Sequence, residues 1–355
     1  MTNSFFQTRM HPDDVPLTAV NTLWGLYEWL VMPMGIKNAP AIHQCQVSAA
    51  LWPFIRRICY VYLDDIVIWS NSLAEHAKNV HLILQALEDA KLCCSPKKTK
   101  LFCTEIHFLG HWISARGIEP EEGKADCIKN WPIPNSASDV RSFLGLIHYL
   151  SAFLPNLAKL TITLDELTRK ECDKEFPGWK PRHQIAFEAI EKLVMSTDCL
   201  TTINPALMPE NKIFAMTDAS DKGSGAILAF RPTYDLACPV AYDSQSFKGA
   251  ELNYPVHENE LFAIIQALGK WWTDLLGHRF EIWTDHKTLE HFENQKDMLR
   301  WQACWMEFLL QYNASINYIP GEKNCVALSP ICQKHPCRTL HPFSAHPMLK
   351  QLFHD

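Results

Sequence analysis

Two adjacent carboxylates, Asp64 and Asp65, form the first candidate for chemistry in the sequence. The runs on either side, CYVYL at 59–63 and IVIW at 66–69, are dense in β-branched and aromatic residues, so they predict two paired strands joined by an acidic tight turn. Such a turn is often no more than solvated surface. The chemical alternative is a platform for divalent ions, which activate a hydroxyl nucleophile and stabilise a departing phosphate group.

A second set of acids, Asp218, Glu260 and Asp285, comes from three separate segments. Asp218 follows the apolar run KIFAMT, Asp285 ends the run FEIWTD, and Glu260 falls in line with apolar positions of a predicted helix. A carboxylate beside an apolar stripe loses hydration, a cost that a partner or a cation must offset. Two strands and a helix can thus supply three carboxylates to metal ions that hydrolyse a phosphodiester. The simpler alternative is three unrelated surface acids.

Hydrophobic periodicity predicts the elements that position these acids. Helices are expected at 72–90, at 138–167 with Ser138 as the cap, and at 256–276, where Trp271 and Trp272 continue the apolar stripe into the core. Strands are expected at 212–220, 225–230, 238–247, 280–285 and 314–320, with a turn at Gly223–Gly225 between the first two. Strands interleaved with helices imply a layered α/β domain.

Composition sets the outer limits of these readings. The 355 residues are 47% hydrophobic and 20% charged, which is typical of a chain with two or three globular domains. A net charge of -6 gives no basic signature, so a nucleic-acid partner must be argued from sites. Thirteen irregularly spaced cysteines favour reduced thiols in an intracellular compartment, cytoplasmic or nuclear. No run approaches the length of a membrane span.

Several motifs resemble the Pol polyprotein of gypsy-type (Metaviridae) LTR retrotransposons. TAVNTLWGLYEWLVMPMGIKNAPAIHQ at 18–44, YVYLDDIVIWS at 60–70 and FLGHWIS at 108–114 follow the order of that family's reverse transcriptase palm motifs. KADCIKNWPIP and FLGLIHYLSAF are similar to its thumb and connecting region. TDASDKGSGAILAF, NYPVHENELFAIIQAL and IWTDHKTLEHF are similar to its ribonuclease H domain.

The resemblance implies a mixed α/β (α+β) fold: a partial reverse transcriptase palm at 1–115, thumb and connection at 116–205, a ribonuclease H-like mixed-sheet domain at 206–331 and a tail at 332–355. It implies RNA-directed DNA polymerase and ribonuclease H activities. The implied partners are an RNA template, a DNA primer, dNTP and an RNA/DNA hybrid, and the implied cofactor is Mg²⁺, with Mn²⁺ as an alternative.

Carried over to this chain, the resemblance makes Asp64 and Asp65 the metal and catalytic residues of the polymerase, and Asp218, Glu260 and Asp285 those of the nuclease. The nucleotide- and primer-binding residues it implies are Phe5, Pro33, Gly35, Gln44, Phe108 and Gly110. Of these, Phe5 would block a ribose 2′-hydroxyl, the segment 33–44 would line the nucleotide pocket, and 108–111 would support the primer end. Without the resemblance, Phe5 reads as one more core aromatic.

The chain departs from the family pattern at two of its acids. The family's first palm Asp falls five residues before the position of Phe5, upstream of Met1, and its fingers fall further upstream. The family's fourth nuclease acid lies in a run like GEKN-x-VADALSR, whereas this chain reads GEKNCVALSP at 321–330, without the Ala-Asp pair. The alternative to an enzyme is therefore a catalytically dead remnant that at most binds nucleic acid or a partner protein.

Overall fold

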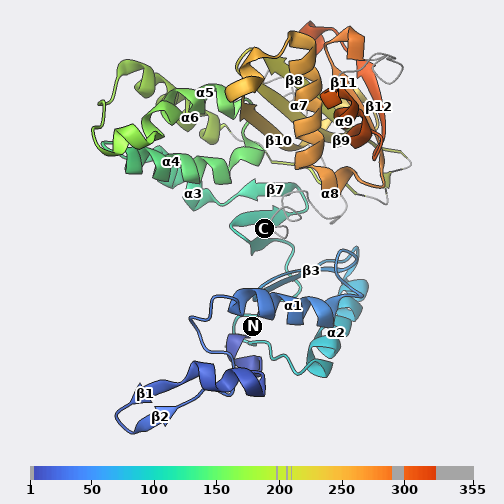
Figure 1. The fold of residues 1–355 in the computed structure, drawn as a ribbon. Coiled ribbons are helices and arrows are strands. Elements are labelled where there is room, and N and C mark those ends of the chain that lie inside the picture. The colour runs from blue at the N-terminus through green and yellow to red at the C-terminus, as the bar shows by residue number, and fades with distance from the viewer. Residues whose placement is uncertain (1–3, 197–198, 205–206, 209, 290–299, 325–355) are drawn as a thin grey trace. The chain divides into compact units, whose positions relative to one another are not determined.

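A computed structural model of the chain describes residues 4–196, 199–204, 207–208, 210–289 and 300–324. These residues fall into two compact units, one that ends at Phe108 and one that begins at Leu109 (Figure 1). No helix in the described ranges is both long and apolar enough to cross a membrane.

The first unit is built around a helix pair and a hairpin. Its elements are the 3₁₀ turns Ser4–Gln7 and Pro12–Thr18, β1 (Val20–Thr22), β2 (Gly25–Tyr27), α1 (Ala39–Leu51), β3 (Cys59–Tyr62), β4 (Asp65–Ile68), α2 (Leu73–Asp89) and β5 (Ile106–Phe108). A buried cluster that includes Val47, Val61 and Ile83 holds α1, β3 and α2 together. Ser72 caps α2 by accepting a 3.2 Å hydrogen bond from the Glu75 amide. The predicted strand pair and the predicted helix at 72–90 are confirmed.

The second unit begins with a small hairpin and a group of helices. These elements are β6 (His111–Ser114), β7 (Gly117–Pro120), α3 (Glu122–Lys129), α4 (Ala137–Tyr149), α5 (Leu157–Asp165) and α6 (Pro181–Met195), with 3₁₀ turns at Ser151–Phe153, Glu166–Thr168 and Lys170–Asp173. The prediction of one helical stretch with Ser138 as its cap is wrong. Ser136 caps α4 instead, accepting from the Asp139 amide, and the chain turns at Pro155 and Asn156 because a left-handed Asn156 (φ 53) cannot continue a helix.

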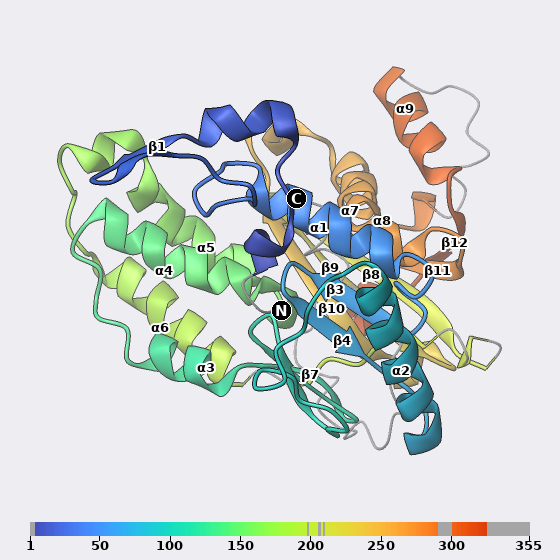
Figure 2. The same ribbon diagram turned by 90° about the horizontal axis from the view of Figure 1, so that it is seen from below.

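A five-stranded mixed sheet forms the rest of the second unit (Figures 1 and 2). Its strands are β8 (Lys212–Ser220), β9 (Gly223–Arg231), β10 (Cys238–Ser246), β11 (Arg279–Thr284) and β12 (Asn313–Tyr318), in the order β10-β9-β8-β11-β12. Strands β8, β9 and β10 are antiparallel neighbours, whereas β11 runs parallel to both β8 and β12. The helices in this part of the second unit are α7 (Val256–Lys270), α8 (Trp272–Leu275) and α9 (Arg300–Leu309). Short 3₁₀ turns lie at Tyr234–Leu236, Gly249–Asn253 and Gly321–Lys323. All five predicted strands are confirmed.

Two local predictions in this sheet need correction. The β8–β9 turn consists of Asp221 and Lys222, not Gly223–Gly225, because Ser220 already pairs with Gly223. Gly223 is required by close packing: a Cβ there would lie 2.4 Å from the Gln245 carbonyl oxygen of β10. The predicted helix at 256–276 breaks at Trp271, which is fully buried as expected, whereas Trp272 is 36% exposed.

Candidate metal centre

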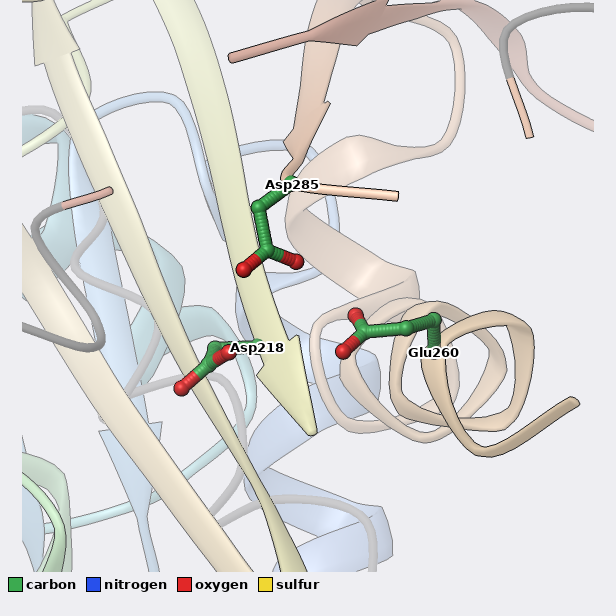
Figure 3. A group of neighbouring side chains, drawn as sticks. All are labelled: Asp218, Glu260 and Asp285. Atoms are coloured by element: carbon green, nitrogen blue, oxygen red, sulfur yellow. The ribbon is translucent and has the colours of Figure 1, made fainter. Parts of the chain in front are cut away.

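Three carboxylates meet at one edge of the five-stranded sheet. Asp218 lies near the carboxyl end of β8, and Asp285 directly follows the last residue of the adjacent parallel strand β11. Glu260 comes from the second turn of α7, which packs against β8. One oxygen of each side chain lies within 4.8 Å of the others, and Figure 3 shows the three groups directed into a common space. The sequence-predicted triad is therefore brought together by the fold.

Glu260 is the most deeply buried member of the cluster, at 3% exposed. Its Oε1 accepts a 3.0 Å hydrogen bond from the Ala219 amide, and its Oε2 accepts a 3.4 Å hydrogen bond from the Thr284 hydroxyl. Burial and then the nearby charge of Asp285 raise the pKa of Glu260 to about 8. The two hydrogen bonds therefore orient a carboxyl that holds its proton up to about neutral pH.

Asp218 is in a similar environment on the neighbouring strand. Burial and then the charge of Asp285 raise the pKa of Asp218, while the positive charge of Lys159 in α5 lowers it. Burial and the charge of Asp285 thus disfavour ionisation of Asp218 and Glu260, and a bound cation would reverse this effect. An all-oxygen donor set of this kind fits a hard divalent ion such as Mg²⁺ or Mn²⁺.

The segment 321–324 packs against the residue before Asp218 and lies close to Asp285. The sequence analysis did not predict this supporting role. Asn324 is fully buried and donates a 3.0 Å hydrogen bond from Nδ2 to the carbonyl of Thr217, the residue before Asp218. A Cβ at Gly321 would lie 3.2 Å from Oδ2 of Asp285, so this backbone approaches the second acid closely. No local signal marks this role, because Asn324 contacts Thr217 and Gly321 approaches Asp285, both distant in the sequence.

The resemblance to the family predicted that an Ala-Asp pair is missing after Val326. The residues from 325 onward, including the site of the absent Ala-Asp pair and the tail at 332–355, lie outside the described residues.

The first unit places Asp64 on the β3–β4 turn, whereas Asp65, predicted on the same turn, is the first residue of β4. Tyr62 pairs with Asp65, so the turn is Leu63 and Asp64, with Leu63 left-handed at φ 47. Its backbone is held by Gln44, whose Oε1 accepts a 2.6 Å hydrogen bond from the Leu63 amide. Gln44, predicted to contact nucleotide or template, therefore also positions the acidic turn.

The buried His43 contacts both the acidic turn and Phe5, the residue predicted to block a ribose 2′-hydroxyl. His43 is fully buried, its Nε2 lies 3.4 Å from Oδ1 of Asp64, and its ring meets the Phe5 ring edge-on at 5.7 Å between centroids. Burial lowers the pKa of His43 despite the opposing charge of Asp64. Because no hydrogen bond joins the two side chains, we interpret the pair as a neutral imidazole packed against a half-exposed carboxylate.

The other predicted binding residues lie in loops and at a strand end. Pro33 and Gly35 lie in the loop before α1, and Gly35 has φ 99, which favours glycine. Phe108 is the buried end of β5. In the second unit, Gly110 also has a positive φ of 74, and Lys124 donates a 3.4 Å hydrogen bond to its carbonyl. Backbone conformation explains the glycines Gly35 and Gly110, and burial explains Phe108, without any ligand. The binding roles of all these residues stay predictions.

Two protein-family models match the chain in succession. Residues 1–113 match the reverse transcriptase (RNA-dependent DNA polymerase) family, and residues 208–312 match the RNase H-like domain found in reverse transcriptase. The chain thus carries reverse transcriptase and RNase H-like family domains, and the curated relatives that it matches are LTR-retrotransposon Pol polyproteins. It is 34% identical over 329 residues to the retrovirus-related Pol polyprotein from transposon 297 of Drosophila melanogaster, covering 92% of this chain and 30% of that polyprotein.

A further relative agrees with this assignment, and two solved structures share the fold. The chain is 34% identical over 311 residues to the transposon Tf2-3 polyprotein of Schizosaccharomyces pombe, covering 85% of this chain and 22% of the relative. It therefore spans less than a third of the length of these curated relatives. A foamy viral protease-reverse transcriptase in complex with double-stranded DNA matches with a TM-score of 0.75 at 23% identity, over 90% of this chain and 56% of that one. The same enzyme in complex with an RNA/DNA hybrid matches with a TM-score of 0.74 at 22% identity, over 97% and 45%. The predicted family and fold class are confirmed.

Proposed function

We propose that the second unit is a ribonuclease H that hydrolyses the RNA strand of an RNA/DNA hybrid, with Asp218, Glu260 and Asp285 as the ligands of Mg²⁺. The observation that supports it best is the cluster of three carboxylate oxygens within 4.8 Å on adjacent strands and a helix. Bound divalent ions at such a site supply an activated water and neutralise charge on the reacting phosphate. Mn²⁺ prefers the same oxygen donors and is the alternative ion.

The residues of the chain prepare the cluster for this role. The Ala219 amide and the Thr284 hydroxyl hold the two oxygens of Glu260 in fixed directions. With its pKa near 8, Glu260 keeps a proton at neutral pH when no cation is present and releases it when one binds. The buried Asn324 donates a hydrogen bond to the carbonyl of Thr217, the residue before Asp218, and so holds the end of β8 against the segment 321–324.

Cleavage of a labelled RNA/DNA hybrid by the whole chain tests the proposal. We expect metal-dependent cutting that EDTA stops and that Asp218→Asn, Glu260→Gln and Asp285→Asn each reduce by orders of magnitude. The exposed Glu307 of α9 provides a matched control, because Glu307→Gln removes one carboxylate charge that is not part of the cluster. Cutting that survives all three cluster substitutions would reject the site assignment.

A second candidate function is RNA-directed DNA synthesis by the first unit. The observation that favours it is that His43 contacts both Phe5, predicted to block a ribose 2′-hydroxyl, and Asp64 of the acidic turn. In this proposal Asp64 and Asp65 hold metal ions, and the partners are an RNA template, a DNA primer and dNTP. Incorporation of dTMP on poly(rA)/oligo(dT) should disappear in Asp64→Asn and persist in Asp218→Asn.

A non-catalytic remnant is the competing interpretation for both units. It predicts that the chain binds a hybrid or a partner protein without cutting the hybrid or extending a primer. Binding and cleavage measured side by side on the same hybrid separate the two: tight binding by a parent chain that never cuts would favour the remnant.

A further inference from the structure

A small surface cleft adjoins the carboxylate cluster and is shared with the helical part of the second unit. One wall is made by the ends of β8, β9 and β10, including Asp218 itself. The other wall is the first turn of α5, including Lys159, more than fifty residues earlier in the chain. The cleft therefore joins a predicted metal ligand to a cation from outside the sheet domain.

The position of Lys159 is fixed by its neighbours. Helix α5 packs along β10, as Figure 1 shows, and the amide of Ala158 donates a 2.7 Å hydrogen bond to the Ser244 hydroxyl of that strand. Leu157 and Ala158 are buried, whereas Lys159 is exposed on the cleft side. The backbone of this turn is thus anchored to the sheet, and the next side chain is free to meet a ligand from solvent.

The polar groups around the cleft have the chemistry of a nucleic-acid backbone site. Lys159 and the exposed Lys222 of the β8–β9 turn bring two positive charges beside an acidic cluster in a chain of net charge -6. Ser220, Asn156 and Gln245 add neutral donors and acceptors. A strand that presents its scissile phosphate to the carboxylates must pass a neighbouring phosphate close to Asp218. Lysine is a compact point charge suited to such a contact.

We propose that this cleft binds a backbone phosphate of the RNA strand next to the scissile one, and that Lys159 of α5 is a positioning residue of the nuclease. The proposal rests on the ribonuclease H function proposed above. It makes the helical segment before the sheet part of the substrate site and not only a connector. It also gives the anionic hybrid a cationic contact beside a cluster that would otherwise repel it.

Hybrid binding in EDTA as a function of salt tests the proposal without turnover. Each phosphate contact contributes about 0.7 to 0.9 to the slope of log Kd against log salt, so losing one weakens binding about five- to eightfold at 0.1 M salt. We expect Lys159→Gln to show both changes in the whole chain and Lys159→Arg to restore most of the affinity. Lys192→Gln, at an exposed site of α6, removes the same charge and should leave the slope unchanged. Equal slopes and affinities for Lys159→Gln and Lys192→Gln would overturn the proposal.

The strand assignment has its own test. Hybrids that carry one uncharged methylphosphonate at successive positions near the cut should show one RNA-strand position at which parent and Lys159→Gln bind equally well. If only a DNA-strand substitution removes the difference, the RNA-strand assignment is wrong. The outcome is separable from the function itself: a parent that cuts the hybrid while Lys159→Gln behaves like Lys192→Gln rejects this inference alone. Lys159-dependent binding without any cleavage rejects the nuclease alone.

Discussion

Replacing Glu260 with Gln should stabilise the metal-free protein at alkaline pH while it abolishes hybrid cleavage. The pKa of Glu260 lies at about 8 instead of its usual 4.5, a difference that corresponds to roughly 5 kcal/mol at about 1.4 kcal/mol per pH unit. Asp218 and Asp285 share the repulsion that causes part of this difference. We therefore expect a gain of about 2 to 4 kcal/mol from the substitution.

The pH dependence gives the sign of the effect. Between pH 4.5 and about 8 the folded protein keeps the Glu260 proton and the unfolded chain releases it, so the free energy of unfolding falls as pH rises across this window. The contribution of the retained Glu260 proton to the free energy of unfolding is complete below pH 4.5 and is lost above about pH 8. The amide side chain of the Glu260→Gln variant is neutral throughout. The difference between variant and parent should therefore be near zero in acid and largest above pH 8.

Urea unfolding in EDTA at several pH values, with hydrogen exchange of peptides from β8 and β11 as the signal, measures this difference within the second unit. The exposed Glu307→Gln serves as the control and should show no such trend. Added Mg²⁺ should stabilise the parent and not Glu260→Gln, because a ligand stabilises only the state that binds it. A Glu260→Gln protein that is less stable than the parent at pH 9 in EDTA would refute the reasoning.

Three further predictions concern the segment 321–324 and the run that follows it in the sequence. Gly321→Ala should slow hybrid cleavage by about tenfold or more with little change in Tm, because the new methyl group would lie 3.2 Å from Oδ2 of Asp285; unchanged cleavage would mean that Asp285 moves without consequence. Asn324→Ala should lower the free energy of unfolding by about 1 to 3 kcal/mol, since the buried Thr217 carbonyl loses its donor; hydrogen exchange of β8 measures this, and unaltered protection would contradict it. Inserting Ala-Asp after Val326 should speed cleavage, by at most roughly 3 to 4 kcal/mol of transition-state stabilisation; equal rates in a gel assay would show that a fourth acid is not limiting.

The strands and the carboxylate triad were predictable because their signals are local. Strands β8 and β11 contain the apolar runs KIFAMT and FEIWT, and Asp218 and Asp285 each directly follow one of these runs. Glu260 was found because Ile264, Ala267 and Trp271 define a helical stripe, and all three are fully buried. Parallel pairing of β8 with β11 then brings the ends of both runs to one edge.

The supporting residues were not predictable because their signals are distant. Asn324 pairs with a carbonyl 107 residues away, and Ala158 pairs with a hydroxyl 86 residues away. Neither contact changes the local pattern of hydrophobic residues. The prediction of Ser138 as the cap was wrong for a different reason: Ser136 precedes the same apolar stripe, and only the folded chain shows that its hydroxyl accepts from the Asp139 amide.

The cluster costs free energy in the metal-free protein, and the packing of α7 explains how the fold tolerates that cost. Glu260 shares its helix face with Ile264, Ala267 and Trp271, which are buried against the sheet together with residues of β8 and β9. Each buried apolar side chain contributes about 1.5 to 3 kcal/mol, so a few of them outweigh one unfavourable carboxyl. The helix cannot rotate Glu260 into solvent without withdrawing that whole face from the core. The hydrophobic stripe thus holds the acid where a cation, and not water, is its best partner.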